Sequence, residues 1–430
     1  MSANVLHRRF ERTLELAPGP FEARRRALDA FLAAGFPTRR DEAWRYTDLK
    51  PIAEGDFDVP PRELGGAVHA RVRSLLDEAS VGASEAAARI VLVDGRLDDT
   101  LSSLGGSPKI EIARIAPEQP VGRRGDGASH PLAMLNRAFA SDGVAIRASA
   151  GAPAAGPVEL FLVASGEGNI AQHPRVSIEL GRNARLAVVV HCLDADADGW
   201  LNLVVDATLD EGSYLEMQRL QEHGSQFHHT SLLTAELGRD SALVAGYVDV
   251  GARIARNDID VRLAAPGAHA DLYGVFVAAP GRHVDNEIHV DHAARETRSE
   301  TDFRGIADRT GRGVFRGKIL VRPDAQKIDA RQKSDNLLLA EQAEIDTRPE
   351  LEIYADDVKC SHGATVGEID ADQMFYMRSR GLDEESARAL LTFGFANRLL
   401  TRLAPERLRN RAARLVAGQL PAPPAWEGLE

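Results

Sequence analysis

Cysteine is scarce in this sequence, with only Cys192 and Cys360 among 430 residues. Two thiols cannot build a disulfide framework, and they cannot supply the four sulfur ligands of a structural zinc site or a metal cluster. Cys192 also shares one face of an alternating apolar run, so we expect a buried thiol there. Any cysteine-based metal chemistry would therefore draw ligands from a partner chain.

Long apolar runs and a surplus of positive charge are also missing. No stretch reaches the ~18 apolar residues that a membrane helix needs. Residues 1–10 are polar and lack the apolar centre of a secretory leader. Lys and Arg number 52 against 64 Asp and Glu, which gives a net charge of −12. Because nucleic acids and anionic lipids attract concentrated positive charge, neither is expected as a partner. We expect a cytoplasmic protein.

Known catalytic and nucleotide-binding motifs are likewise absent from the sequence. It contains no P-loop, no Rossmann glycine fingerprint, no GxSxG elbow and no HExxH helix. We therefore expect a protein that is not an enzyme and that has no nucleotide site of its own.

What the sequence does contain is the composition of a folded protein, 44% hydrophobic and 27% charged. Its length predicts two or three structural units. Residues 1–150 are mainly helical in pattern, with one strand at 90–93 that ends in an Asp-Gly turn. Residues 151–366 show short apolar alternations, and helical periodicity returns in residues 367–430.

The middle region carries a weak repeat. Similar turn sequences begin at Leu180, Leu209, Leu237 and Leu263, at separations of 29, 28 and 26 residues. A β-sandwich would also give short, regular strands. The near-constant step, with a turn in every unit, favours a solenoid of stacked β-coils that needs helical caps at its ends.

Histidines, which are common metal ligands, gather in the same region. Their spacing does not match the cupin pattern of two histidines one residue apart. They are better interpreted as ordinary strand or surface histidines, and we assign them no metal-binding role. These residues are His223, His228, His229, His283, His289 and His292.

The segment KCSHGAT gives a sharper candidate site. Cys360 and His362 point to the same side if this segment is a strand. A thiolate and an imidazole can share a soft or borderline metal ion, although two ligands leave its coordination sphere half empty. The alternative is a strand end at which a cysteine and a histidine meet by chance.

Two further segments have unusual apolar content. The sequence DEAWRYTDL (residues 41–49) has an aromatic pair that suggests a docked, packed turn. A predicted helix over 383–403 is apolar almost all round at 390–396, so it is either buried or a partner's docking surface. Its docking candidates are Leu390, Leu391, Phe393 and Phe395.

Several stretches together resemble the SufB/SufD family of iron–sulfur cluster assembly scaffold proteins, on the SufD side. They are CSHGATVGEID, DQMFYMRSRGLDEESARALLTFGF, FRGKILVRPDAQKIDARQKSDNLLL, DEAWRYTDL and LNRAFASDG. They extend over nearly the whole chain. The residues after His362 are Gly-Ala-Thr, where the SufB pattern resembles Glu-Ala, and SufB is richer in cysteine.

The resemblance implies a right-handed parallel β-helix flanked by N-terminal and C-terminal helical domains. It also implies a complex with SufB and two copies of the ATPase SufC, in which ATP binding drives rearrangement of the SufB–SufD interface. His362 matches the family's interface histidine, with Cys360 as an accessory ligand to iron or a transient cluster that a SufB cysteine completes. The SufC-docking role falls on residues 370–403. The sequence leaves flavin binding by the complex open.

Three alternatives remain. A divergent homologue could form homodimers. A polysaccharide lyase or hydrolase could use a β-helix, but such enzymes are usually secreted and expose rows of carboxylates in a groove. A cupin-like or metal-storing protein would purify with stoichiometric metal in the absence of a partner. Because fold alone does not decide function, the site must discriminate among them.

Overall fold

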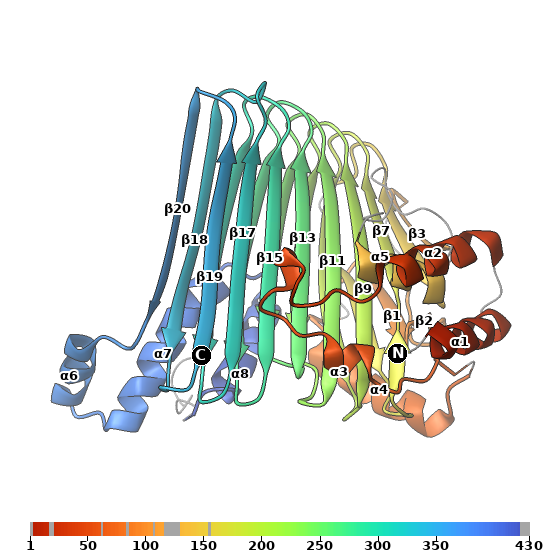
Figure 1. The fold of residues 1–430 in the computed structure, drawn as a ribbon, viewed down its shortest axis with the longest axis horizontal. Coiled ribbons are helices and arrows are strands. Elements are labelled where there is room, and N and C mark those ends of the chain that lie inside the picture. Colours follow the sequence, from red (N-terminus) through yellow and green to blue (C-terminus); the bar gives the residue numbers. More distant parts are fainter. Residues whose placement is uncertain are drawn as a thin grey trace.

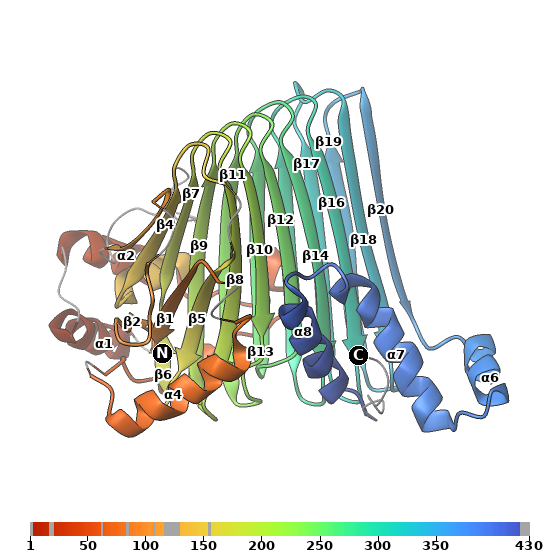
Figure 2. The same cartoon turned by 180° about the vertical axis from the view of Figure 1, so that it is seen from behind.

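Two long, mainly parallel β-sheets form the body of the protein in the computed structural model (Figures 1 and 2). The structure describes residues 3–16, 21–61, 63–82, 86–105, 108–115, 130–153 and 156–421. Residues 422–430, the end of the predicted C-terminal domain, lie outside this part.

Sheet A faces the viewer in Figure 1. Its strands are β3 (Ile110–Ile115), β4 (Gly143–Ala148), β6 (Ile170–Gln172), β7 (Arg175–Leu180), β9 (Gly199–Leu209), β11 (Phe227–Leu237), β13 (Ile254–Leu263), β15 (His283–His292), β17 (Arg312–Val321) and β19 (Glu344–Ile353).

Sheet B faces the viewer in Figure 2. Its strands are β1 (Ala88–Val93), β2 (Arg96–Leu97), β5 (Val158–Ala164), β8 (Arg185–Asp194), β10 (Tyr214–Gln221), β12 (Ala242–Asp249), β14 (His269–Ala278), β16 (Arg298–Ala307), β18 (Ile328–Leu338) and β20 (Val358–Gly367).

The chain alternates between the two sheets, so each turn adds one strand to each, and the result is a parallel β-solenoid of about eight turns. Leu180, Leu209, Leu237 and Leu263 end β7, β9, β11 and β13, which confirms the predicted repeat. Strands of successive coils pair in parallel, unlike those of a sandwich of antiparallel sheets. The antiparallel strands β2 and β3 finish the two sheets at the N-terminal end.

The core lies between the sheets. Alternate side chains of each strand point inward and stack coil upon coil, as Leu186, Val188, Val190 and Cys192 do on β8. The buried Cys192 thiol is thus a core residue, as predicted. Burial raises its pKa to about 12, so the thiol stays protonated at neutral pH.

Helices of the N-terminal region cover parts of both outer faces. These helices are α1 (Ala3–Leu16), α2 (Phe21–Ala34), η1 (Glu42–Trp44), α3 (Lys50–Ala53), α4 (Gly66–Ala79) and α5 (Pro131–Phe139). The helices α1, α2 and α5 pack around Trp200 on sheet A, and α4 packs on β1, β5 and β8 of sheet B. The predicted turn after the first strand is present, with positive φ at Asp94 and Gly95.

The C-terminal helices lie across sheet B (Figure 2). They are α6 (Ala371–Ser379), α7 (Glu384–Leu400) and α8 (Glu406–Gly418). Asp370 and Asp383 cap α6 and α7 by accepting backbone N–H groups. The helices α7 and α8 bury apolar side chains against β12, β14 and β16, whereas α6 extends away from the body.

The predicted fold class, a β-solenoid core between terminal helices, is confirmed. Strands β1 to β4 precede residue 151, yet β1 pairs with β5 and β4 with β7, while β20 ends at Gly367. The division at residues 150 and 366 stays a prediction. None of the described helices is long and apolar enough to cross a membrane.

Candidate functional site at the open end of the solenoid

The strands β19 and β20 end the two sheets at the C-terminal end. In the described part of the chain their outer edges have no neighbouring strand, so they present unpaired backbone N–H and C=O groups. Side chains on the inward face of this last coil are also uncovered, because no further coil stacks on them. The solenoid is therefore open at the end that β20 marks, on the left in Figure 1.

The strand β20 carries both predicted ligands. Cys360 lies in register with Ala330 on β18, and His362 lies in register with Gln332. Ala330 and Gln332 are buried on the inward face of β18, whose alternate residues are exposed. Cys360 and His362 therefore both face the solenoid interior at its open end, and the predicted strand is confirmed.

The two candidate ligands differ in exposure. His362 is exposed, whereas Cys360 is half-buried and packs against an apolar cluster that includes Ile328 and Ala330. Burial, and to a lesser degree the nearby Asp329 carboxylate, raise the pKa of the Cys360 thiol, opposed by its backbone hydrogen bond with Ala330. The thiol is thus protonated at neutral pH in the isolated chain, and a metal ion would have to displace its proton.

Large apolar side chains surround this end of the solenoid. Tyr354 is 62% exposed, Val366 42% and Ile353 38%. Exposed apolar groups beside two free strand edges are typical of a surface that another β-protein covers. Within the described part of the chain, no group of three or more His, Cys, Asp or Glu side chains is arranged to hold a metal ion. Cys360 and His362 are thus two candidate ligands and do not form a complete metal site by themselves.

The predicted docking residues on α7 differ in burial and in the side chains that they contact. Phe393 is only 9% exposed and belongs to the core cluster between α7, α8 and sheet B. Phe395 lies against Arg304, whose guanidinium carbon is 4.8 Å from the ring centroid. Leu391 and Phe395 line a hollow of about 380 Å³ beside the ends of β18 and β20. Leu390 is half-buried.

The exposed aromatic residues of this region are on α6 instead. Phe375 is 76% exposed and Tyr376 57%, and α6 buries none of its residues. Sequence reasoning did not single them out, because a short helix with no apolar stripe gives no periodic signal. Their exposure is visible only from the fold.

Three of the clustered histidines are buried, His223 and His229 beside an ion pair in the core and His228 against Phe57 of the N-terminal region. Arg219 contacts Asp249 at 2.6 Å and the His229 ring at 3.2 Å. Burial lowers the pKa of His223 to about 3 and that of His228 to about 4, and it lowers that of His229 strongly. All three rings are therefore neutral at pH 7.

Each of the other three histidines has different contacts. His292 contacts the hydroxyls of Thr297 and Ser299, and burial lowers its pKa to about 4. His289 forms an ion pair with Asp260 when protonated, on the outer face of sheet A. His283 contacts Thr47 of the N-terminal region at 2.8 Å.

That contact belongs to a segment, residues 41–49, which we name the strap. It crosses the outer face of sheet A (Figure 1). Trp44 is buried, and its ring stacks on Arg256, whose guanidinium carbon lies 3.9 Å from the centroid. Glu42 reaches Arg348 on β19 at 2.8 Å. The prediction of a packed turn is confirmed, and its partners are both apolar and charged.

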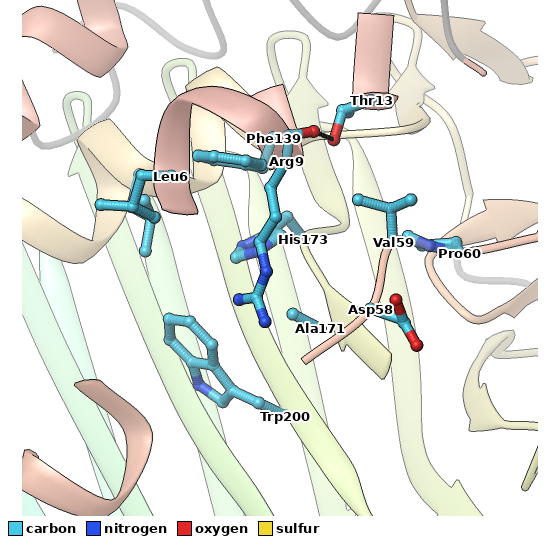
Figure 3. Close-up of a pocket in the computed structure, with 11 residues that line it drawn as sticks. Leu6, Arg9, Thr13, Asp58, Val59, Pro60, Phe139, Ala171, His173 and Trp200 are labelled. Atoms are coloured by element: carbon cyan, nitrogen blue, oxygen red, sulfur yellow. Dashed lines mark hydrogen bonds between the residues drawn. The ribbon is translucent and has the colours of Figure 1, made fainter. Parts of the chain in front are cut away.

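A small pocket lies between α1, α5 and sheet A (Figure 3). Arg9, His173 and Trp200 point into it from three different elements. Its cavity of about 20 Å³ has room for about one water molecule. Burial lowers the pKa of His173 to about 3. In this conformation the pocket is too small for a nucleotide or a flavin.

The fold and the open end define the class of protein, a β-solenoid that presents a histidine and a thiol at an uncovered end. Residues 161–395 match the family model described as SUF system FeS cluster assembly, SufBD core domain, and residues 17–71 match the SufBD protein N-terminal region. The chain belongs to the SufBD family of iron–sulfur cluster assembly proteins.

Individual relatives agree with this assignment. The chain is 29% identical over 407 residues to the iron–sulfur cluster assembly protein SufD of Escherichia coli, an alignment that covers 92% of each chain. It is 29% identical to a SufBD family protein of Synechocystis, over 92% of this chain and 90% of that one. A family protein of Mycobacterium leprae is 26% identical over 91% of this chain and 92% of its own.

Proposed function

We propose that this chain is the SufD-side scaffold of an iron–sulfur cluster assembly complex. In this role it pairs through its open end with a SufB-like sister subunit, and the iron or nascent cluster is built between them. His362 is its principal ligand and Cys360 an accessory one. The observation that supports this most is the position of His362, exposed and inward-facing on the last strand of an uncovered solenoid.

A sister subunit of the same fold suits this end physically. Its own last coil could cover the apolar side chains of Ile353, Tyr354 and Val366 and satisfy the free edges of β19 and β20. The iron or cluster is the cargo of such a complex. Since Cys360 and His362 leave most coordination positions open, the sister subunit would supply the remaining ligands, including a cysteine.

The C-terminal helices suit a second partner, a SufC-like ATPase. The chain has no nucleotide motif, so a cycle driven by ATP would depend on another subunit. The helix α6 offers Phe375 and Tyr376 to it, and Leu391 and Phe395 line the hollow between α7 and β20. A movement of these helices would act on the same strand that carries His362. Such a scaffold acts in the cytoplasm without catalysing a reaction itself.

Replacement of His362 by Ala tests the proposal. We expect the variant to fold and to assemble with both partners, since an exposed residue contributes little to stability. Cluster accumulation during anaerobic reconstitution with iron and sulfide should fall by at least about tenfold, as expected for the loss of a ligand group. Cys360→Ser should have a weaker effect.

The matched control is His289→Ala, which removes a histidine from the outer face of sheet A, away from the open end. It should accumulate cluster at the wild-type rate. If the His362→Ala complex also does so, in reconstitution and in cells, then His362 has no role in assembly and the proposal is wrong.

A further inference from the structure

The C-terminal part of β20, residues 361–367, which we name the distal segment, has no buried side chain. All of its residues are exposed, and β18 is its one neighbour in sheet B among the described strands. Segments with few buried contacts and exposed backbone hydrogen bonds open locally at a low free-energy cost. Apolar packing therefore does not fix the place of the distal segment, which carries His362.

Two side chains of β18 hold the distal segment through hydrogen bonds with Thr365. Thr365 Oγ1 donates to Asp335 Oδ1 at 3.0 Å, and Asn336 Nδ2 donates to the Thr365 carbonyl at 3.0 Å. Among the described residues, no other side-chain hydrogen bond reaches this segment. Asp335 and Thr365 are Cα partners, so their bond fixes the pairing of the two strands close to His362.

Asp335 is also connected to the helix α7. Arg304 on β16 is its Cα partner on the other side, and Arg304 Nη2 lies 3.7 Å from Asp335 Oδ2. The same guanidinium donates to the backbone carbonyl of Phe395 at 2.6 Å and lies over the Phe395 ring. Arg304 is only 5% exposed, so water competes little for these contacts. A row of contacts therefore extends from α7 across three neighbouring strands to Thr365.

A second polar contact at the end of α7 does not extend to β20. Arg402 forms an ion pair with Asp271 on β14, and its guanidinium carbon lies 3.9 Å from the centroid of the Tyr273 ring. The residue of β18 in the same row as Asp271 is Arg331, which pairs with Asp329 of its own strand. The row through Arg304 is thus distinct from this one, and Asp271 provides a control position.

We propose that Asp335 is a positioning residue for the distal segment, and that Arg304 makes this positioning depend on α7. When the segment is paired with β18, His362 has a fixed place at the open end, and when it opens, the histidine is displaced. Asp335, Thr365 and Phe395 all line the hollow beside the ends of β18 and β20, so a partner bound there would shift this equilibrium. The consequence for iron rests on the proposed function, but the opening is a property of the isolated chain.

Amide hydrogen exchange of the isolated chain, without iron or partners, measures this opening. Thr365→Val keeps the shape of the side chain and removes the donor, so residues 361–367 should exchange about fivefold faster, as for one lost hydrogen bond. Thr365→Ser keeps the hydroxyl and should stay within about twofold of the wild-type rate. The urea unfolding midpoint should not change in either variant.

The two substitutions distinguish the hydrogen bond from strand propensity. Valine favours strands more than serine does, so without the bond the serine variant would exchange faster than the valine variant. That order, or a wild-type rate in Thr365→Val, would overturn the inference.

Arg304→Met tests the dependence on α7. Alone it should raise the exchange rate of residues 361–367 by about threefold, and it should add nothing in a Thr365→Val background, where the row of contacts is already broken. Asp271→Asn is the matched control and should leave this exchange unchanged. Additive effects of Arg304→Met and Thr365→Val would refute the link to α7. If the methionine variant does not fold, Arg304→Lys, which lacks the planar fork, takes its place.

The assembled complex separates this inference from the proposed function. Thr365→Val should slow cluster accumulation during anaerobic reconstitution, and Thr365→Ser should not. A wild-type rate in Thr365→Val, where His362→Ala is impaired, would show that opening of β20 does not displace the histidine. Faster exchange in Thr365→Val without any effect of His362→Ala would instead refute the proposed function and leave the role of Asp335 in β20 standing.

Discussion

At the scale of single residues, the strap is held by a charged cluster that burial makes sensitive to pH. Burial outweighs the neighbouring Arg256 and Arg316 and raises the pKa of Glu287 to about 8. Because this acid has a higher pKa in the folded than in the unfolded chain, its stabilising effect is full below pH 4.5, its ordinary value, and is lost as the pH rises through 8. The strap should therefore be held less tightly in alkali.

Glu287→Gln should remove this dependence. We expect the variant to be more stable than the wild type at pH 9, by on the order of 2 kcal/mol, and to show a flatter stability profile between pH 5 and 8. Urea unfolding followed by tryptophan fluorescence measures this. The control Glu236→Gln, on the same sheet, should keep the wild-type profile. An unchanged profile in Glu287→Gln would mean that the carboxyl is ionised in the folded protein.

The residue scale also shows where prediction from sequence stops. Cys360 and His362 could be paired from the sequence because residues two apart share a face in any strand. Asp335 could not be found in this way. Its bond with Thr365 depends on the register between β18 and β20, and its contact with Arg304 depends on the register between β16 and β18. Neither relation leaves a periodic signal.

At the scale of elements, α7 buries apolar side chains and α6 exposes them, a difference that the sequence did not show. An apolar stretch at 390–396 fitted either burial or docking, and the structure buries Phe393 while leaving Phe375 and Tyr376 exposed. Deletion of the chain from Asp383 onward would remove α7 and α8 and uncover the apolar face of sheet B. Loss of ATPase binding by that truncation would therefore not distinguish docking from unfolding.

Replacement of Phe375 and Tyr376 by Ser gives a cleaner test of α6. Stability should change by less than about 0.5 kcal/mol, because neither ring packs on the body. Affinity for a SufC-like ATPase should fall by about tenfold or more, as for exposed aromatic anchors of an interface. Leu415→Ser on α8 is the control on the covering helices, and pull-down with titration calorimetry measures both. Unchanged affinity of the double variant would place the docking surface elsewhere.

At the scale of the whole molecule, the solenoid was predictable because each coil repeats the same pattern of apolar strand and turn at nearly the same length. The strap was not. Its partners Arg256, Asp285 and Arg348 are brought to it only when β13, β15 and β19 stack in order. Segments that connect distant coils have no counterpart in a local pattern, so their contacts appear only in the folded chain.

The open end is a feature of the whole molecule. A charged substitution there should weaken association with another subunit without changing the stability of the fold. Val366 lies on the inward face of β20, in register with Asn336, whereas Ser361 lies on the outward face of the same strand. Inward side chains of one coil stack on the inward side chains of the next. Val366→Asp should therefore bury a charge at an interface formed by this end, and Ser361→Asp should not.

We expect Val366→Asp to keep the wild-type unfolding midpoint and to lose stable association with a SufB-like subunit, or with a second copy of this chain if it forms homodimers. Ser361→Asp should associate normally. Size exclusion with light scattering, on each variant alone and mixed with the sister subunit, measures both cases. A Val366→Asp chain that still pairs at wild-type affinity would show that the open end is not the shared interface, and His362 would then lie outside any site built between subunits.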